Sequence, residues 1–171
     1  LPADESVATA VRDAQAVGWA VVYLHKGDCV PLGDGAWAEV VHPADGFPTG
    51  DANAASMVLA LHLGDATALM MADLPSVDEV DAFPDCDLIK VAHHGADEST
   101  GERVLQLSSP SVAVISVGRN GYGHPGEATI NRLLAEGAKI YRTDERGAVT
   151  VSLDPDGNAE VTCFRAGEEK R

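Results

Sequence analysis

Three short segments of this sequence place side chains that can bind metal ions directly after a run of apolar residues. Asp73 follows the first run, the pair His93-His94 follows the second, and His124 lies in a loop after the third. Carboxylate and neutral imidazole are common ligands of zinc and similar ions, and Gly95 allows close backbone approach to an ion or substrate. These residues could form part of a metal-dependent hydrolase, although a two-metal site needs more ligands than they supply.

The loop at residues 118–125 and the entry to an earlier strand supply candidate substrate contacts. The loop is rich in glycine and offers backbone amides, an imidazole and a guanidinium, which suit a phosphate or an oxyanion. Gly118 and Asn120 are its candidate substrate-binding residues. Asn53 and Ser56, where a polar loop enters a strand, are the others, and alone they also fit a purely structural entry to that strand.

Each candidate has a structural alternative. Asp73 could cap a helix or lie in a solvated turn, and one histidine of the pair could face the core while the other faces water. The glycine-rich loop could simply connect a strand to a helix. The remaining histidines, His25, His42 and His62, are interpreted as structural or solvated.

The elements that must position these residues follow from hydrophobic periodicity. The pattern predicts strands at 19–25, 29–32, 36–41, 56–63, 66–71, 88–92, 112–117, 139–142, 148–153 and 159–164, and helices at 6–17, 101–107 and 126–136. Strands that alternate with helices and end in a meander predict a layered domain of helices and strands. Because neighbouring parallel strands end at one edge of a sheet, we expect Asp73, the histidine pair and His124 to converge there.

Composition excludes several functions. The chain has 171 residues with 27 acidic and 12 basic side chains, a formal charge of −15, so a broad electrostatic grip on nucleic acid by this chain alone is not expected. No apolar run is long enough to span a membrane. Three scattered cysteines provide neither a disulfide framework nor a zinc knuckle. The sequence also lacks a Walker A loop, a dinucleotide-binding glycine fingerprint and a Gly-x-Ser-x-Gly elbow.

Several segments, in order, resemble the metallo-β-lactamase-like domain of the ComEC competence family of DNA-uptake proteins. The segments are residues 26–28, 32–35, 53–59, 88–95 with Ser99-Thr100, 113–118, 122–125, and 141–144 with Gly147. The resemblance implies an α+β fold, an αββα sandwich. The family's His-x-His-x-Asp-His motif is absent, so residues 1–166 are expected to be the C-terminal portion of an incomplete sandwich without its front strands. Residues 167–171 are expected to be a frayed tail.

The resemblance also implies roles for the candidate residues. Asp73 would bridge divalent metals, zinc or manganese, His94 would bind metal, His93 would line the site, and His124 would contact the scissile phosphate or its leaving group. The family usually has Thr-Gly-Asp where this chain has Met71-Ala72-Asp73, which weakens the implied bridging role.

Two functions remain open at this point. The chain would be part of a metal-dependent nuclease or phosphodiesterase domain, inactive by itself and expected to bind metal only weakly, or a non-catalytic scaffold of a larger membrane protein. Its implied partners are DNA, through the parent protein, and the rest of the same polypeptide including a membrane domain. Exposed apolar strand faces would also favour a homo-oligomer. The expected location is a soluble domain of a cell-membrane protein, with the extracytoplasmic side favoured.

Overall fold

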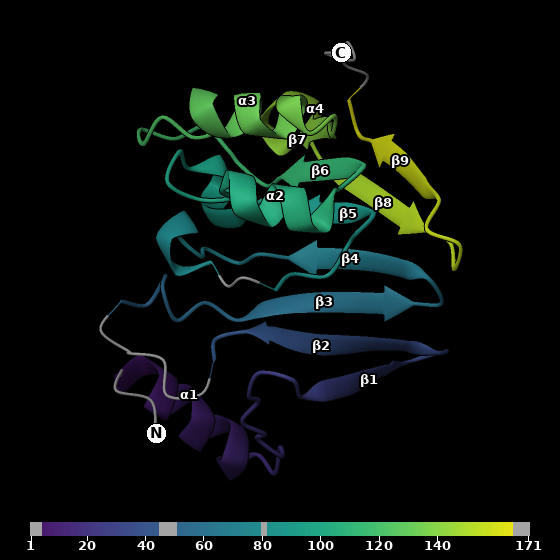
Figure 1. Ribbon diagram of the computed structural model, residues 1–171. Coiled ribbons are helices and arrows are strands. Elements are labelled where there is room, and N and C mark those ends of the chain that lie inside the picture. The colour runs from purple at the N-terminus through teal and green to yellow at the C-terminus, as the bar shows by residue number, and fades with distance from the viewer. Residues whose placement is uncertain (1–4, 45–50, 80–81, 166–171) are drawn as a thin grey trace.

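A seven-stranded mixed sheet forms the centre of the protein (Figure 1). The computed structural model describes residues 5–44, 51–79 and 82–165. In spatial order the strands are β1 (Cys29–Gly33), β2 (Ala36–His42), β3 (Val58–Leu63), β4 (Ala66–Met70), β5 (Leu88–Lys90), β6 (Val112–Ile115) and β7 (Lys139–Arg142). The first four strands are antiparallel neighbours, whereas β4 to β7 run parallel. Tight turns at residues 34–35 and 64–65 join β1 to β2 and β3 to β4.

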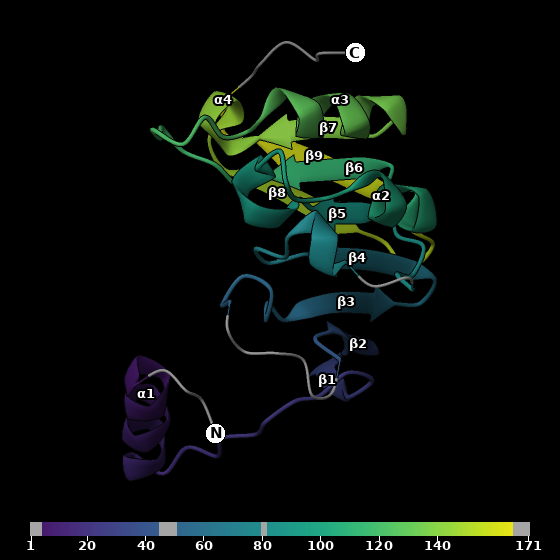
Figure 2. The same cartoon turned by 60° about the vertical axis from the view of Figure 1, so that its left-hand side comes forward.

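Helices cover one face of the parallel half of the sheet. Alternate residues of the strands, including Leu69, Ile89 and Ile115, are fully buried and pack in one cluster with Leu105 of α2 (Glu102–Ser108) and Leu133 of α3 (Glu127–Ala135). Both helices lie on the same side of the sheet (Figure 2). The core is therefore aliphatic, as expected for a chain in which only 5% of residues are aromatic.

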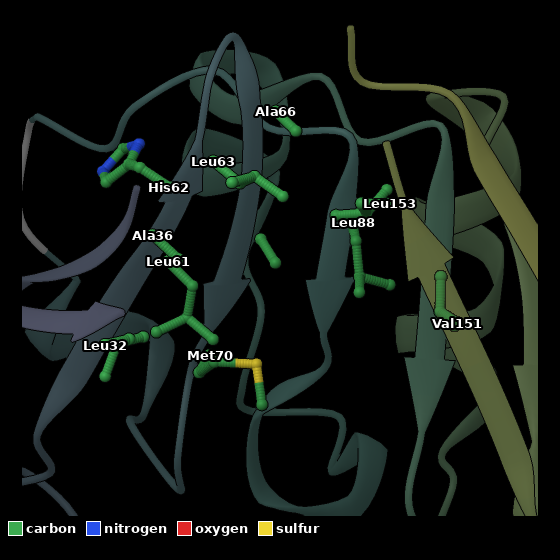
Figure 3. Close-up of a pocket in the computed structure, with 11 residues that line it drawn as sticks. Leu32, Ala36, Leu61, His62, Leu63, Ala66, Met70, Leu88, Val151 and Leu153 are labelled. Atoms are coloured by element: carbon green, nitrogen blue, oxygen red, sulfur yellow. The ribbon is translucent and has the colours of Figure 1, made fainter. Parts of the chain in front are cut away.

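A two-stranded hairpin, β8 (Val149–Leu153) and β9 (Ala159–Cys163), lies across the opposite face of the sheet. Beside it an apolar groove of about 380 Å³ remains open (Figure 3). Its walls come from the other set of alternating strand residues and from β8; they are Leu32, Ala36, Leu61, His62, Leu63, Ala66, Ala68, Met70, Leu88, Val151 and Leu153. The described residues thus contain a helix layer, a sheet and a partial second β layer.

The predicted sandwich is present only in part. The described second sheet has two strands, and the helices that pack on the large sheet cover a single face of it within those residues. The predicted helix at 6–17 is α1 (Glu5–Ala16), and a short 3-10 turn, Ser76–Asp78, follows Asp73. The predicted tail at 167–171 lies outside the described residues. Among those residues, no helix combines the length and the apolar character that crossing a membrane requires.

The predicted buried strand at 19–25 is wrong. This segment has no regular structure, and Trp19 and Val22 are 71% and 73% exposed. Strand β1 is the last strand on this side of the sheet, and α1 lies away from it (Figure 2). The segment therefore lacks, among the described residues, the neighbouring strand that would pair with its backbone, and an apolar run becomes a buried strand only when such a partner is present.

Candidate functional site

The candidate residues meet at one edge of the sheet, where β4, β5 and β6 end side by side. The His93 and His124 ring centroids are 5.5 Å apart, and those of His93 and His94 are 6.3 Å apart. The backbone N–H of His93 donates to the Ala72 carbonyl at 2.9 Å, which places the histidine turn beside Asp73. The three histidine rings therefore lie close together and the backbone next to Asp73 lies beside them, whereas a shared site that includes the Asp73 carboxylate stays a prediction. We call this region the carboxyl edge.

The histidine pair lies in a strained turn, Ala92–Gly95, that replaces the predicted last residues of strand β5. His93, His94 and Gly95 have φ angles of 44°, 54° and 82°. This left-handed region is costly for side chains other than glycine, and such residues persist only where their surroundings hold them in place. The backbone reversal turns both imidazoles toward the loops at the carboxyl edge.

Two buried hydroxyl groups hold this turn. The Thr100 hydroxyl accepts the Ala92 N–H at 3.0 Å, and the Ser99 hydroxyl bonds the carbonyl oxygens of Ala92 and Ala96 at 3.1 and 2.9 Å. Both hydroxyl residues are fully buried. Buried polar backbone groups require hydrogen-bond partners. Ser99 and Thr100 supply these partners to backbone groups of the strained turn and of Ala96 directly after it.

Helix α3 clamps the segment that follows the histidine turn. The Thr129 hydroxyl donates to the Ala96 carbonyl at 2.7 Å, and one Asp97 carboxylate oxygen accepts the N–H groups of Ala128 and Thr129 at 2.9 and 3.3 Å. Asp97 thereby caps a helix whose own N-cap position is Gly126, which has no side chain. The helix and the histidine turn are thus one packed unit.

His94 is chemically ready to act as a ligand. Its Nδ1 lies 2.6 Å from the Ser116 carbonyl oxygen, and because a carbonyl only accepts hydrogen bonds, Nδ1 must carry the proton. In a neutral ring the lone pair is then on Nε2, and the His94 side chain is exposed. A backbone carbonyl that fixes the tautomer in this way is a usual support for a metal-binding imidazole.

Asp73 is supported by groups from β2, from β5 and from the segment that leads into β3. Its backbone N–H donates to the Ser56 hydroxyl at 3.2 Å, and buried His42 donates from Nδ1 to the Ser56 carbonyl at 2.9 Å. Lys90 donates to the Ala72 carbonyl at 3.4 Å. Burial lowers the pKa of Lys90, and the negative charge of Asp73 opposes that shift. Ser56, a predicted substrate contact, therefore has a positioning contact to Asp73 in this structure.

Sequence reasoning missed Lys90 and gave His42 only a general structural role. Lys90 is the one charged residue in an apolar strand, Leu88–Lys90, and that signal could have drawn attention to it. His42 carries no such signal, because its contact with Ser56 depends on how β2 pairs with β3. Ala72 has a φ of 48°, a region favourable to glycine, which agrees with the glycine that the resembling family has there.

Asn120 organises the glycine-rich loop. Its side-chain amide donates to the carbonyl oxygens of Gly118 and His124 at 2.9 and 2.8 Å, and its Oδ1 accepts the N–H groups of Tyr122 and His124 at 3.0 and 3.1 Å. The loop is therefore closed by one side chain. Substrate binding by Gly118 and Asn120 stays a prediction, and the Asn120 amide is used within the loop.

Asn53 lies in the turn that leads into β3. Its N–H donates to the Asp51 carboxylate at 2.8 Å, and its carbonyl accepts the Ser56 N–H at 3.0 Å. These bonds fix the turn from which Ser56 reaches Asp73. Substrate binding by Asn53 likewise stays a prediction.

The described residues do not complete a metal centre. Within residues 5–44, 51–79 and 82–165, no three His, Cys, Asp or Glu side chains come close enough together to hold an ion. Asp73 and His94 are at most part of a ligand set, since a bound ion requires about four to six donors.

A carboxylate with a raised pKa, that of Glu79, supports the end of the loop that follows the histidine turn, residues 96–101. Glu79 accepts the Gly101 N–H at 2.8 Å, and burial raises its pKa from 4.5 to about 7. The folded protein therefore holds a proton that the unfolded chain releases above pH 4.5, so this contribution to stability is lost as pH rises from 4.5 to 7. With partial solvent screening, we expect a loss of about 1–2 kcal/mol.

Denaturant unfolding at pH 5 and pH 8 tests this prediction. Glu79→Gln keeps a hydrogen-bond acceptor but cannot titrate, so the variant should gain stability relative to the unaltered protein between pH 5 and pH 8. Glu98→Gln is the matched control, because Glu98 is an exposed carboxylate in the loop that follows the histidine turn. An equal pH dependence in the Glu79 variant and the unaltered protein would contradict the prediction.

Comparisons with known proteins show which proteins this chain resembles in sequence. No family model matches the sequence. The chain is 32% identical over 154 residues to ComE operon protein 3 of Bacillus subtilis (strain 168), covering 86% of this chain and 19% of that protein. It is 34% identical over 131 residues to competence protein ComA of Neisseria gonorrhoeae, covering 72% of this chain and 19% of the relative. Recombination protein 2 of Haemophilus influenzae is 30% identical over 108 residues, or 61% of this chain and 14% of that protein.

A solved structure shares the fold. The crystal structure of a protein assigned as a metal-dependent hydrolase from Parabacteroides distasonis superposes with a TM-score of 0.50 at 14% identity, over 77% of this chain and 60% of that one. At this identity the likeness concerns the arrangement of strands and helices. The chain spans about a fifth of the length of the first two relatives. The chain is thus distantly homologous, over most of its length, to one short section of the ComEC/ComA competence proteins.

Proposed function

We propose that the chain is the C-terminal part of a metal-dependent nuclease or phosphodiesterase domain, of metallo-β-lactamase-like fold, in a competence protein that takes up DNA. The observation that carries the proposal is the gathering of the His93, His94 and His124 rings at the carboxyl edge, beside the backbone that leads into Asp73, with the His94 Nε2 lone pair free to bind. The homology to competence proteins and the fold shared with an assigned hydrolase support it.

The residues of this chain would have distinct tasks. Asp73 and His94 would provide part of the ligand set for a divalent ion, which would supply Lewis-acid chemistry once further ligands complete the site. His93 packs against the His124 ring and would fix its orientation. His124, half-buried in a loop closed by Asn120, would face the scissile phosphodiester and could donate a proton to the leaving oxygen.

The open groove has a proposed occupant as well. We propose that another part of the same polypeptide, a β layer, packs over the apolar wall that includes Leu61, Met70 and Leu88. The relatives are about five times longer than the section matched here, and the solved neighbour extends beyond its matched 60%. The same additional chain would bring the missing metal ligands and attach the domain to the membrane, on its extracytoplasmic side.

Cleavage of single-stranded DNA, with metal content measured in parallel, tests the proposed function. The 171-residue chain should show little or no hydrolysis with manganese or zinc, whereas a longer chain that restores the missing histidines should cleave in a chelator-sensitive way. The longer chain should also bind less of a dye that reports exposed apolar surface, because the groove is covered. Robust chelator-sensitive cleavage by the 171 residues alone would contradict the partial ligand set proposed here.

Two substitutions in the longer chain separate the roles. Asp73→Ala should abolish turnover and reduce metal content, whereas His124→Ala should reduce turnover with metal content largely intact. The matched controls are Asp156→Ala in the exposed β8–β9 turn and His25→Ala, which is exposed near Asp28. Both controls should cleave at the rate of the unaltered longer chain. Full activity in the Asp73 variant would overturn the proposal.

A non-catalytic scaffold is the second candidate function. It is favoured by one observation: the described residues bring no three potential ligands together. A longer chain that folds cooperatively, covers the groove and yet neither binds a divalent ion nor cleaves DNA would establish this alternative.

A further inference from the structure

A row of aromatic rings leads from the carboxyl edge to the protein surface. The His93 and His124 ring centroids lie 5.5 Å apart, and the next pair, His124 and Tyr122, lies 5.9 Å apart with the ring planes only 19° from parallel. Tyr122 ends the row and is 84% exposed. One face of its ring stacks on His124, so the large exposed area leaves the other face open to a ligand.

Asn120 holds the loop backbone that carries this ring, while the ring itself stays exposed. Asn120 accepts the Tyr122 N–H at 3.0 Å and the His124 N–H at 3.1 Å, and it donates to the His124 carbonyl at 2.8 Å. These bonds fix the backbone on both sides of Gly123. Because this backbone is already ordered and the ring stacks on His124, binding of a ligand requires little further ordering of the loop, which favours a role in recognition.

The charge of the protein narrows the kind of ligand. With a formal charge of −15, the chain offers no broad basic surface that could follow a phosphate backbone. Stacking of a base on an aromatic ring does not depend on net charge and accepts any base, because every base has a π face. Arg119, exposed in the same loop, is a nearby cation for a single phosphate. Bases are accessible in this way in single strands and not within a duplex.

We infer that Tyr122 is a stacking platform for a nucleobase of single-stranded DNA, and that it positions the strand beside His124. The inference rests on the proposed function, for which it specifies the substrate as single-stranded. Tyr122 is then a positioning residue, because it holds the base next to the site and does not touch the phosphodiester that reacts.

Binding without metal tests the inference separately from hydrolysis. In a buffer with chelator and about 0.15 M salt, which screens the repulsion between the acidic protein and the phosphates, fluorescence anisotropy would compare a labelled oligothymidine strand, an abasic strand of equal length and a duplex. The oligothymidine strand should bind at least about tenfold more tightly than either of the others. Tyr122→Ala should weaken its binding about tenfold, whereas Tyr122→Phe, which keeps the ring, should stay within about twofold of the unaltered protein.

Photo-crosslinking locates the contact. A strand that contains 5-iododeoxyuridine should form its main adduct on Tyr122, as read by mass spectrometry of the digested protein. Tyr23→Ala is the matched control, since Tyr23 is also exposed but lies in the segment before β1. Equal affinity for the abasic strand, an unchanged dissociation constant in Tyr122→Ala, a main adduct on Tyr23, or no binding at millimolar strand would each overturn the inference.

The outcomes distinguish this inference from the proposed function. Base-dependent binding through Tyr122 together with an inactive longer chain would support the platform and contradict the nuclease. Cleavage by the longer chain with no loss of strand affinity in Tyr122→Ala would support the nuclease and contradict the platform. Circular dichroism of each variant checks that the fold is intact, which is expected because the Tyr122 ring is exposed.

Discussion

Replacement of Gly95 by alanine is expected to lower the free energy of unfolding by about 2–4 kcal/mol. The residue has a φ of 82°, where a side chain is strained, and an added Cβ would lie 2.7 Å from the Pro125 Cβ and 3.2 Å from the Ile115 Cγ2. The Gly126 N–H also donates to the Gly95 carbonyl at 2.8 Å. The methyl group must therefore push apart the two loops that carry the histidine pair and His124.

Substitutions at two other glycines distinguish the effect of backbone strain on stability from the effect of steric contact. Gly123 has a φ of 83° with nothing within 4 Å of an added Cβ, so Gly123→Ala should cost about 1 kcal/mol from backbone strain alone. Gly118→Ala, with neither strain nor contact, should be close to neutral. Denaturant unfolding measures all three, and NMR of the imidazole groups reports whether His93 and His124 separate. Equal costs for Gly95→Ala and Gly123→Ala would show that the loop contact contributes nothing.

Replacement of Arg132 by alanine is expected to lower the free energy of unfolding by about 2–3 kcal/mol. The guanidinium donates from Nε to the Thr100 carbonyl at 3.1 Å and from Nη2 to the carbonyl oxygens of Asp97 and Ser99 at 2.8 and 2.9 Å. It also donates to the Thr129 hydroxyl at 2.8 Å. One side chain of α3 therefore closes most of the loop that supports the histidine turn, and its removal leaves partly buried carbonyl oxygens without a donor.

A lysine at the same position should not restore the lost stability. The guanidinium is a planar fork that reaches several acceptors at once, whereas an ammonium is a single point on a flexible chain. We expect Arg132→Lys to recover less than half of the loss. Arg103→Ala, an exposed arginine on α2, is the matched control and should stay within about 0.5 kcal/mol of the unaltered protein. Full recovery by lysine would mean that charge alone, and not the fork geometry, holds the loop.

These two predictions concern the loops because the strands alone do not create the site. Strands β4, β5 and β6 place their ends together, but Asp73, the histidine pair and His124 all lie beyond the last paired residues. The orientation of each side chain is then set by neighbours from other loops and from α3. If the loop contacts weaken, the histidines lose their mutual arrangement while the sheet remains.

The sequence by itself determined most strands and helices and the convergence of the candidate residues. Alternation in residues 58–63 and 66–70 places one set of side chains on each face of the sheet, and this pattern is a property of the local chain. The parallel order of β4, β5 and β6 then brings their ends together, as expected from strands that alternate with helices. Each of these steps depends on residues that are close in the sequence.

Only the tertiary structure decided which predicted strand is absent and which partners hold the site. The run 19–25 has strand composition but stays outside the sheet, because burial requires a partner strand that the segment itself does not encode. The contacts of Arg132 with residues 97–100 join positions as much as 35 residues apart, and the Ser56 hydroxyl reaches Asp73 across 17. Hydrogen-bond partners so far apart in sequence are selected by how the whole chain packs, so no local pattern specifies them.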